Sequence, residues 1–292
     1  MLSAAKRLVK THFRYLPHNI ASTAMDDAAE LGSKLAELLT TRRLGWPSHI
    51  FESLGSTQDQ ARAEAQAGAP DGTLVWALEQ TAGRGRIDRA WSSRRGAGLW
   101  FSVVLRPEGD PNAAALLSLA AGVGLARALQ VPTDGAVKLK WPNDVLLDGR
   151  KLAGILAEAE THDGQVRFVI LGVGLNLDPG PEGFPPEIAE QAAALSEAAS
   201  GSIDAATLMG RLLGELEDAI DMAQAQPEAL RQAWLAVSDT IGREVRAELG
   251  GEARTGRAVD LDLDGSLVIE DADGNLSRVR AGEVVHLRPA ES

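Results

Sequence analysis

The sequence predicts an α+β fold: a mixed β-sheet that carries helices, followed by a small β-barrel of SH3-like size. Short β-like runs alternate with helical patterns from about residue 46 to residue 237, and only β-like runs follow Ser238. A length of 292 residues suits one large domain with one or two small ones. We therefore expect an N-terminal extension with one helix (1–45), a large mixed-sheet domain (46–237) and a C-terminal domain (238–292).

The first predicted element is a helix over residues 26–43. Asp27 stands at its start and Arg42 and Arg43 at its end, so the charges complement the helix dipole. Leucines form an apolar stripe at helical spacing between them (Leu31, Leu35, Leu38 and Leu39). The basic residues 1–20 lack the apolar core of a signal peptide, so we interpret them as an extension.

The large domain contains a series of short β-like runs, at residues 49–54, 73–79, 99–105, 137–140, 145–147, 152–158 and 166–171. Helical patterns lie at 57–66 and 112–129, and the second has Asp110 as a cap and Pro111 in its first turn. Asp148 and Gly149 signal a hairpin turn. The alanine-rich residues 185–199 and 205–236 are expected to be mostly helical.

Beyond Ser238, the predicted strands cover residues 243–249, 258–263, 267–270, 276–279 and 284–287. Two Asp-Gly dipeptides, at 264–265 and 273–274, mark tight turns between them. Five short strands in about 50 residues are typical of a small SH3-like barrel.

Composition excludes several classes of site. The chain has no cysteine, which rules out disulfides, thiolate nucleophiles and cysteine-bound zinc, and no two histidines stand at i, i+4. The formal net charge is −12, so we expect no general binding of nucleic acid. No apolar run reaches the roughly 18 residues of a membrane helix. The absence of cysteine fits a reducing compartment, and we expect a cytoplasmic protein.

The most unusual segment is residues 80–95, which contains five arginines and one acid between positions 84 and 95. Gly83 and Gly85 allow the backbone to approach a ligand closely, and arginine makes forked contacts to phosphate or carboxylate. Trp91 could stack on an aromatic base. A solvated basic turn is the alternative, but the alternation of Gly and Arg beside a Trp favours an anion-binding loop. Five like charges should repel each other while such a loop is empty.

Three further segments carry candidate residues. In KLKWPND, Pro142 is tolerated at a strand end, so Asn143 and Asp144 project from a turn unless this is a plain connection between strands. In RKLAGILAE, Lys151 opens an apolar strand and either points into a cleft or lies along the sheet edge. The segment GVGLNL, which contains Asn176, does not match a dinucleotide-binding fingerprint, and no P-loop occurs in the chain.

Together these segments resemble those of the biotin–protein ligases. The motifs GRGRxxRxW, KWPND, RKLAGIL-E and GVGLNL occur in the order and spacing of that family, and Ser56, Thr57 and Gln58 are similar to its Ser-Thr-Asn. The resemblance is strong over residues 49–178 and weaker over 241–288, where the family has its C-terminal SH3-like domain. It implies the biotin/lipoate ligase fold, in a monofunctional form without a DNA-binding domain.

The resemblance implies an ATP-dependent ligase. Such an enzyme joins biotin to ATP as biotinyl-5′-adenylate and then transfers biotin to a lysine of a biotin carboxyl carrier domain, as in acetyl-CoA carboxylase. The biotin carboxylate must approach the α-phosphate, and two unit charges about 4 Å apart repel by roughly 4 kcal/mol at an effective dielectric of 20. Arginine, lysine and the Mg²⁺ that accompanies ATP would offset this repulsion.

The resemblance also assigns roles to residues. The implied catalytic residues are Lys151, Arg86 and Asp144. The implied biotin-binding residues are Ser56, Thr57, Gln58, Gln80, Arg84, Gly85, Arg86, Lys151 and Gly154. The implied ATP- and adenylate-binding residues are Arg84, Arg89, Trp91, Asn143, Asn176 and Arg288. No protein metal site is expected, because Mg²⁺ is carried by ATP.

Three positions depart from the family pattern. Gln58 stands where the family usually has Asn, Asp88 stands where it has Gly, and Gly98 stands where Asn is frequent. The departure at Gln58 puts a biotin contact in doubt. Asp88 lies inside the arginine-rich segment of residues 80–95, which we call the arginine loop.

Other functions are compatible with parts of this pattern. A lipoate or octanoate ligase or transferase of the same fold should keep a lysine like Lys151 but lack the GRGRxxRxW loop. A biotin-responsive repressor needs a winged helix-turn-helix, whereas the roughly 50 residues before Ser56 hold one clear helix and no recognition-helix pattern. A non-catalytic biotin-binding protein would not need Lys151 and Asp144. We expect no membrane or nucleic-acid partner, and the sequence leaves a homodimer open.

Overall fold

The computed structural model describes residues 27–86, 89–107, 113–199, 203–249, 252–280 and 283–286. Within these residues, seven strands form one sheet in the order β1-β2-β3-β7-β6-β5-β4. Only β1 and β2 run parallel, and the other neighbours are antiparallel, so the sheet is mixed as predicted. The strands are β1 (Ser48–Phe51), β2 (Leu74–Ala77), β3 (Gly98–Leu105), β4 (Val137–Lys140), β5 (Asp144–Leu147), β6 (Arg150–His162) and β7 (Gln165–Asn176).

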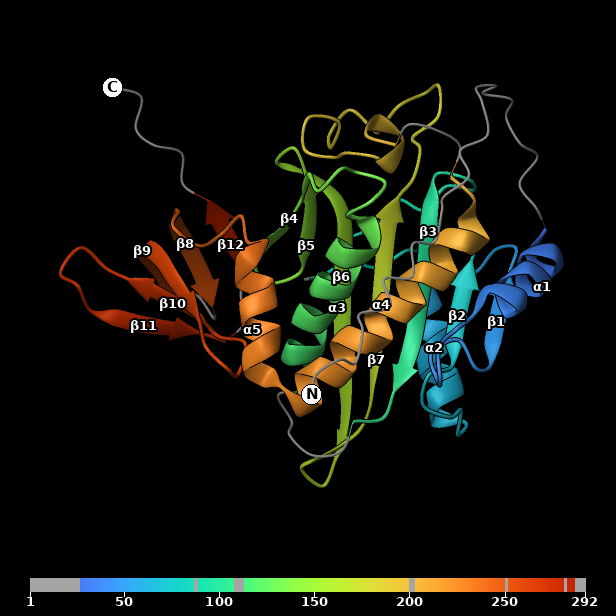
Figure 1. The fold of residues 1–292 in the computed structure, drawn as a ribbon, viewed down its shortest axis with the longest axis horizontal. Helices are drawn as coiled ribbons and strands as arrows, with labels where there is room; N and C mark the ends of the chain where they lie inside the picture. Colours follow the sequence, from blue (N-terminus) through green and yellow to red (C-terminus); the bar gives the residue numbers. More distant parts are fainter. Residues whose placement is uncertain are drawn as a thin grey trace, which may run out of the picture.

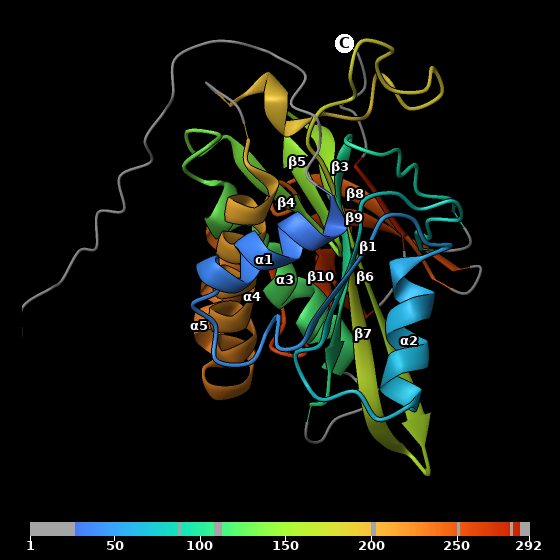
Figure 2. The ribbon, with the colours of Figure 1, turned by 90° about the vertical axis from the view of Figure 1, so that its right-hand side faces the viewer.

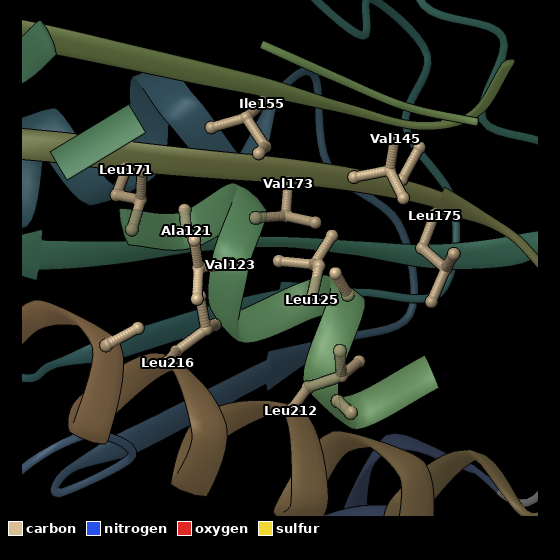
Figure 3. Packing of buried hydrophobic residues seen from close by; sticks show 14 of the residues in the cluster. Ala121, Val123, Leu125, Val145, Ile155, Leu171, Val173, Leu175, Leu212 and Leu216 are labelled. Atoms are coloured by element: carbon tan, nitrogen blue, oxygen red, sulfur yellow. The ribbon is translucent and has the colours of Figure 1, made fainter. Parts of the chain in front are cut away.

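Helices cover both faces of this sheet (Figures 1 and 2). One face carries α1 (Ala28–Leu38), α3 (Ala113–Leu129), α4 (Ala205–Ala225) and α5 (Pro227–Ala236), and the other carries α2 (Thr57–Gln66). Helix α3 lies between the sheet and α4, and Figure 3 shows strand side chains such as Ile155 and Val173 facing it. Because side chains alternate along a strand, the apolar odd-numbered residues of β7 point to α3 and the even-numbered ones point away (Leu171, Val173 and Leu175 against Gly172, Gly174 and Asn176).

Helix α2 begins where the local sequence predicts. The Ser56 hydroxyl accepts a hydrogen bond from the amide of Gln58 at 3.3 Å, which caps the helix. Its buried residues Ala61 and Ala65 pack on Phe168 and Ile170 of β7. This packing places the start of α2 beside the even-numbered residues of the two central strands.

The C-terminal unit is a five-stranded antiparallel sheet within the described residues, in the order β11-β10-β9-β8-β12. Its turns include Gly265 and Gly274, whose positive φ angles of 85° and 81° suit the predicted Asp-Gly turns. The Trp141 indole N–H donates to the Gly265 carbonyl at 3.1 Å, which joins this sheet to the large one. The strands are β8 (Glu244–Leu249), β9 (Glu252–Leu261), β10 (Leu267–Glu270), β11 (Leu276–Val279) and β12 (Glu283–His286).

Helix α1 is shorter than predicted and ends at Leu38 instead of residue 43. The backbone amides of Arg42, Arg43 and Leu44 donate to the buried carboxylate of Glu217 on α4, at 2.8, 2.9 and 3.1 Å. These tertiary hydrogen bonds hold residues 42–44 in a turn. The Asp27 side chain accepts from the amide of Glu30, so the start of the helix agrees with the expected acidic cap.

The helix predicted over 185–199 was wrong. That segment consists of turns and one short 3₁₀ helix (Leu195–Glu197), because its backbone pairs with the sheet: the Lys151 amide donates to the Gln191 carbonyl, and the Ala193 amide donates to the Lys151 carbonyl. The helical stretch 205–236 divides at Pro227, which starts α5. Strands β6 and β7 are longer than predicted because they pair along their whole length, through a turn at Asp163 and Gly164. The predicted cap Asp110 and Pro111 lie outside the described residues.

Candidate functional site

A cavity of about 840 Å³ opens over β6 and β7, next to the start of α2. This volume is ordinary for a small-molecule site. Three residues on this face of the two strands have no side chain and line the cavity: Gly154, Gly172 and Gly174. A Cβ atom at Gly154 or Gly174 would lie 2.8 or 2.5 Å from the ring of Trp91. The glycines therefore form a floor on which this indole rests.

The structure brings together every predicted site residue that it describes. These residues come from the four motifs, from residues 56–58 and from position 80, and all line the same cavity: Ser56, Thr57, Gln58, Gln80, Arg84, Gly85, Arg86, Arg89, Trp91, Asn143, Asp144, Lys151, Gly154 and Asn176. Arg288 and Asp88 lie outside the described residues.

Lys151 points into the cavity. Its Nζ lies 2.6 Å from Oδ1 of Asp144 and 5.3 Å from the centroid of the Trp91 ring. A β-bulge makes this possible, because the β5–β6 register shifts between the pairs Val145–Ala153 and Leu146–Lys151. Bulges redirect a side chain, and here Lys151 comes to lie against Gly154, three residues away on the same strand.

Small polar groups form one end of the cavity. The amide of Thr57 donates to Oε1 of Gln80 at 2.8 Å, and Nε2 of Gln80 donates to the Ser93 hydroxyl at 2.7 Å. The Thr57 hydroxyl lies 2.9 Å from that of Ser102, which is fully buried. This end can recognise a compact ligand that carries both donors and acceptors.

The arginines of the loop do not form the self-repelling cluster that the sequence suggested. Acids from distant parts of the chain neutralise three of them: Arg84 pairs with Asp59 and Glu158 at 2.7 and 2.9 Å, Arg94 pairs with Glu182 at 3.0 Å, and Arg95 pairs with Glu52 at 2.6 Å. For Arg84, burial lowers the pKa, but the two acids outweigh it and raise the pKa above its usual value. The expectation of mutual repulsion was therefore wrong for these three side chains.

Comparison with known proteins places this site in a family. Residues 50–176 match the model of the "Biotin/lipoate A/B protein ligase family", and residues 240–287 match that of the "Biotin protein ligase C terminal domain". The biotin–[acetyl-CoA-carboxylase] ligase of Mycobacterium tuberculosis is 40% identical over 252 residues, which cover 84% of this chain and 91% of the relative. The chain belongs to the biotin protein ligase family.

Further matches agree with this membership. The bifunctional ligase/repressor BirA of Bacillus subtilis is 35% identical over 237 residues, which cover 81% of this chain and 73% of that protein. The biotin protein ligase from Aquifex aeolicus in complex with biotin and ATP superposes with a TM-score of 0.72 at 27% identity, covering 85% of this chain and all of that one. The predicted fold class and the resemblance stated from the motifs are confirmed.

Two of the departures from the biotin protein ligase pattern have a structural reason. The Gln58 carboxamide is buried, and its Oε1 accepts from Ser102 while its Nε2 donates to Glu158 and to the Ile170 carbonyl. A Cβ at Gly98 would lie 2.2 Å from the Trp100 ring, so any larger residue at position 98 would displace that indole.

The sequence did not indicate several residues of the cavity wall. Ser102 lies in a buried strand, where its single hydroxyl gave no pattern. Phe184, Pro185 and Ile188 also line the cavity, and they belong to the segment that was wrongly expected to be helical. Arg243 is contributed from beyond Ser238. Gly172 and Gly174 also line the cavity, and for these two residues the GVGLNL motif did contain a signal.

Asn143 and Asn176 are held by the backbone. Asn143 donates to the Ile155 carbonyl at 2.8 Å and accepts from Arg86 at 3.0 Å. Asn176 donates to the Ala193 carbonyl at 3.0 Å.

Among the residues with described positions, no group of three or more His, Asp or Glu side chains could hold a metal ion, and no helix is long and apolar enough to cross a membrane.

Proposed function

We propose that this chain is an ATP-dependent biotin–protein ligase that makes biotinyl-5′-adenylate and transfers the biotinyl group to a lysine of a biotin carboxyl carrier domain. The observation that carries the proposal is the position of Lys151. Its ammonium lies 2.6 Å from Asp144, in the cavity that the polar groups of Thr57 and Gln80 also line. A cation in this place would meet both a carboxylate and a phosphate.

The polar end of the cavity suits the ureido group of biotin, which offers one acceptor and two donors. In this proposal Ser56, Thr57 and Gln80 bind that group, while Gln58 supports them from behind. The bicyclic ring and the valeryl chain lie against Trp91, whose indole rests on Gly154 and Gly174. The backbone at Arg84 and Gly85 closes over the ligand.

The other half of the cavity suits a nucleotide. In this proposal Arg89, Asn143 and Asn176 bind ATP together with the apolar side chains of Phe184 and Ile188. The family resemblance assigns a further ATP contact to Arg288, which lies outside the described residues. ATP brings Mg²⁺ as part of the substrate.

The chemistry consists of two substitutions. A biotin carboxylate oxygen attacks the α-phosphorus, the bond to the β-phosphate bridging oxygen breaks, and pyrophosphate leaves. Lys151 and Arg86 offset the charge that gathers at this centre, and Asp144 orients Lys151. A neutral lysine amine of the carrier then attacks the carbonyl of the mixed anhydride, so that an amide forms, AMP leaves and the amine loses a proton.

The acceptor in this proposal is the carrier domain of acetyl-CoA carboxylase, after the name of the Mycobacterium tuberculosis relative. We further propose a cytoplasmic protein with the domain limits 1–45, 46–237 and 238–292. Lipoate ligation is the alternative within the same family model, and repression of transcription is the alternative suggested by the Bacillus subtilis relative.

One assay separates these functions. Purified protein is incubated with MgATP and a carrier domain, with biotin or lipoate in parallel, and the mass of the carrier is measured. Biotin alone is expected to be attached, to the carrier lysine. Attachment of lipoate instead, or no attachment of biotin, would overturn the proposal. Titration of a biotin-operon DNA duplex at physiological salt tests the repressor alternative, and we expect no binding.

A further inference from the structure

Glu158 belongs to the RKLAGIL-E segment of β6, yet the reaction described above gives it no role. Its carboxylate accepts three hydrogen bonds from other elements: from Arg84 at 2.9 Å, from Arg62 at 2.9 Å and from Gln58 at 3.0 Å. The side chain is three-quarters buried. Glu158 therefore joins the arginine loop, helix α2 and the central sheet at one point.

This carboxylate holds one end of the arginine loop. The two terminal nitrogens of Arg84 are directed at acids, NH1 at Asp59 at 2.7 Å and NH2 at Glu158 at 2.9 Å. Arg84 also faces Ala90 across a short antiparallel bridge, and the amide of Gly85 donates to the Arg89 carbonyl. The start of the loop is thus a small hairpin that is anchored from outside by carboxylates.

A chain of hydrogen bonds leads from Glu158 into the polar pocket. Gln58 donates to Glu158 and accepts from Ser102 at 3.1 Å. The Ser102 hydroxyl also lies 2.9 Å from that of Thr57, and either oxygen of this pair can be the donor. The carboxylate is therefore connected, through two buried side chains, with a group proposed to bind the biotin head.

The same chain continues to the other end of the loop. The amide of Thr57 donates to Gln80, Gln80 donates to Ser93, and Ser93 donates to the carbonyl of Trp91 at 3.2 Å. The amide of Trp91 in turn donates to the Gly83 carbonyl at 2.8 Å. Both ends of the hairpin 84–91 are consequently tied to one polar network that runs behind the pocket.

We propose that Glu158 is a positioning residue for biotin binding: it anchors the arginine loop at Arg84 and, through Gln58, joins that anchor to the polar pocket. This inference rests on the proposed function. Glu158 does not touch the substrate in this account. It sets where the loop backbone lies before the ligand arrives, so that binding does not have to order this end of the loop.

The proposal requires a negative charge at position 158. A glutamine at 158 would offer one carbonyl oxygen in place of two carboxylate oxygens, and its amide hydrogens would face the guanidinium groups of Arg84 and Arg62. The chain provides a matched control, because Glu160 stands two residues further along β6. Glu160 contacts Arg62, Arg167 and Gln66, whereas Arg84 and Gln58 contact Glu158.

The test compares Glu158→Gln with Glu160→Gln in the full-length protein. Biotin KM is expected to rise about tenfold in Glu158→Gln, while the rate of transfer from added biotinyl-5′-adenylate at saturation changes less than about twofold. Glu160→Gln should match the wild type in both. Glu158→Asp keeps the charge and should recover part of the loss. Thermal unfolding shows whether each variant is folded. If Glu158→Gln is not folded, Glu158→Asp is compared with Glu160→Gln instead, and its biotin KM is expected to rise by less than the tenfold expected for Glu158→Gln.

Hydrogen exchange gives a second readout that does not depend on activity. In the protein without ligands, amides of residues 83–86 should exchange faster in Glu158→Gln than in the wild type, and those of β7 should be unchanged. An unaltered biotin KM, an equal effect of Glu160→Gln, or tighter biotin binding by Glu158→Gln would overturn the inference. If the wild type attaches no biotin, the proposed function fails, and the exchange experiment still tests the anchor.

Discussion

The Nζ atom of Lys151 lies 2.6 Å from Oδ1 of Asp144, and the ring of Trp91 covers it at 5.3 Å. The three side chains come from β6, from the start of β5 and from the arginine loop. A carboxylate and an aromatic face both stabilise an ammonium group, so the cation is held at a defined point of the cavity before any ligand arrives.

Lys151→Ala is expected to lower adenylate formation by roughly 100- to 1,000-fold, because the encounter of carboxylate and phosphate loses its point charge. Pyrophosphate release in the presence of biotin and MgATP measures this step. Lys138→Ala is the control, since Lys138 is exposed on β4, at the edge of the same sheet. Near-normal pyrophosphate release by Lys151→Ala would contradict the role proposed for this lysine.

Gly174→Ala is expected to raise biotin KM by roughly 10- to 200-fold, because the new methyl group would lie 2.5 Å from Trp91 and push the indole into the biotin subsite. The ATP KM should change much less. Gly214→Ala on α4 serves as the control, since a Cβ there has its nearest neighbour at 4.0 Å. Equal changes in the KM values for biotin and ATP would show that the floor does not act on biotin alone.

Trp141→Phe is expected to destabilise the protein by about 1–3 kcal/mol, because it leaves the buried carbonyl of Gly265 without its donor. The segment that leads into the C-terminal sheet supplies Asp239 and Arg243 to the cavity wall, so the apparent ATP KM should rise more than the biotin KM. Denaturation and steady-state kinetics check the two effects, with the exposed Trp46→Phe as the control. An unchanged ATP KM would argue against a contribution of the C-terminal domain to ATP use.

Glu217 predicts a pH dependence of stability. Burial alone would raise the pKa of this carboxyl, but the amides of Arg42, Leu44 and Arg43 donate to it and hold the pKa below its usual value of 4.5. A lowered folded-state pKa stabilises the protein above the unfolded-state value, and this stabilisation is lost as the pH falls through the folded-state pKa.

Glu217→Gln should therefore cost about 1–3 kcal/mol at pH 7, and its stability should converge on that of the wild type below about pH 4.5. Urea unfolding across this pH range provides the measurement. Asp218→Asn, which changes an exposed acid on the same helix, should follow the wild-type profile. A constant difference between Glu217→Gln and wild type at every pH would reject the assignment to this carboxyl.

Local patterns in the sequence determined much of this protein. The helical pattern at residues 57–66 predicted the start of α2, and Asp148 with Gly149 predicted the β5–β6 turn, because helix and turn formation depend on neighbours within a few residues. The order of the four motifs identified the family and, through the resemblance, many of the residues that line the cavity. It did not indicate Ser102, Phe184 or Arg243, which lie outside these motifs.

Only the tertiary structure decided how those residues are used. A bulge in β6 turns Lys151 into the cavity. Glu158 and Asp59 form ion pairs with Arg84. Glu217 on α4 accepts from the Arg42 amide just after the end of α1. Each of these contacts joins groups that are far apart in the chain or depends on the register between two strands. Periodicity and turn signals report local backbone preference, whereas the partner of a charge or a backbone amide is set by which distant segment the folded sheet brings beside it.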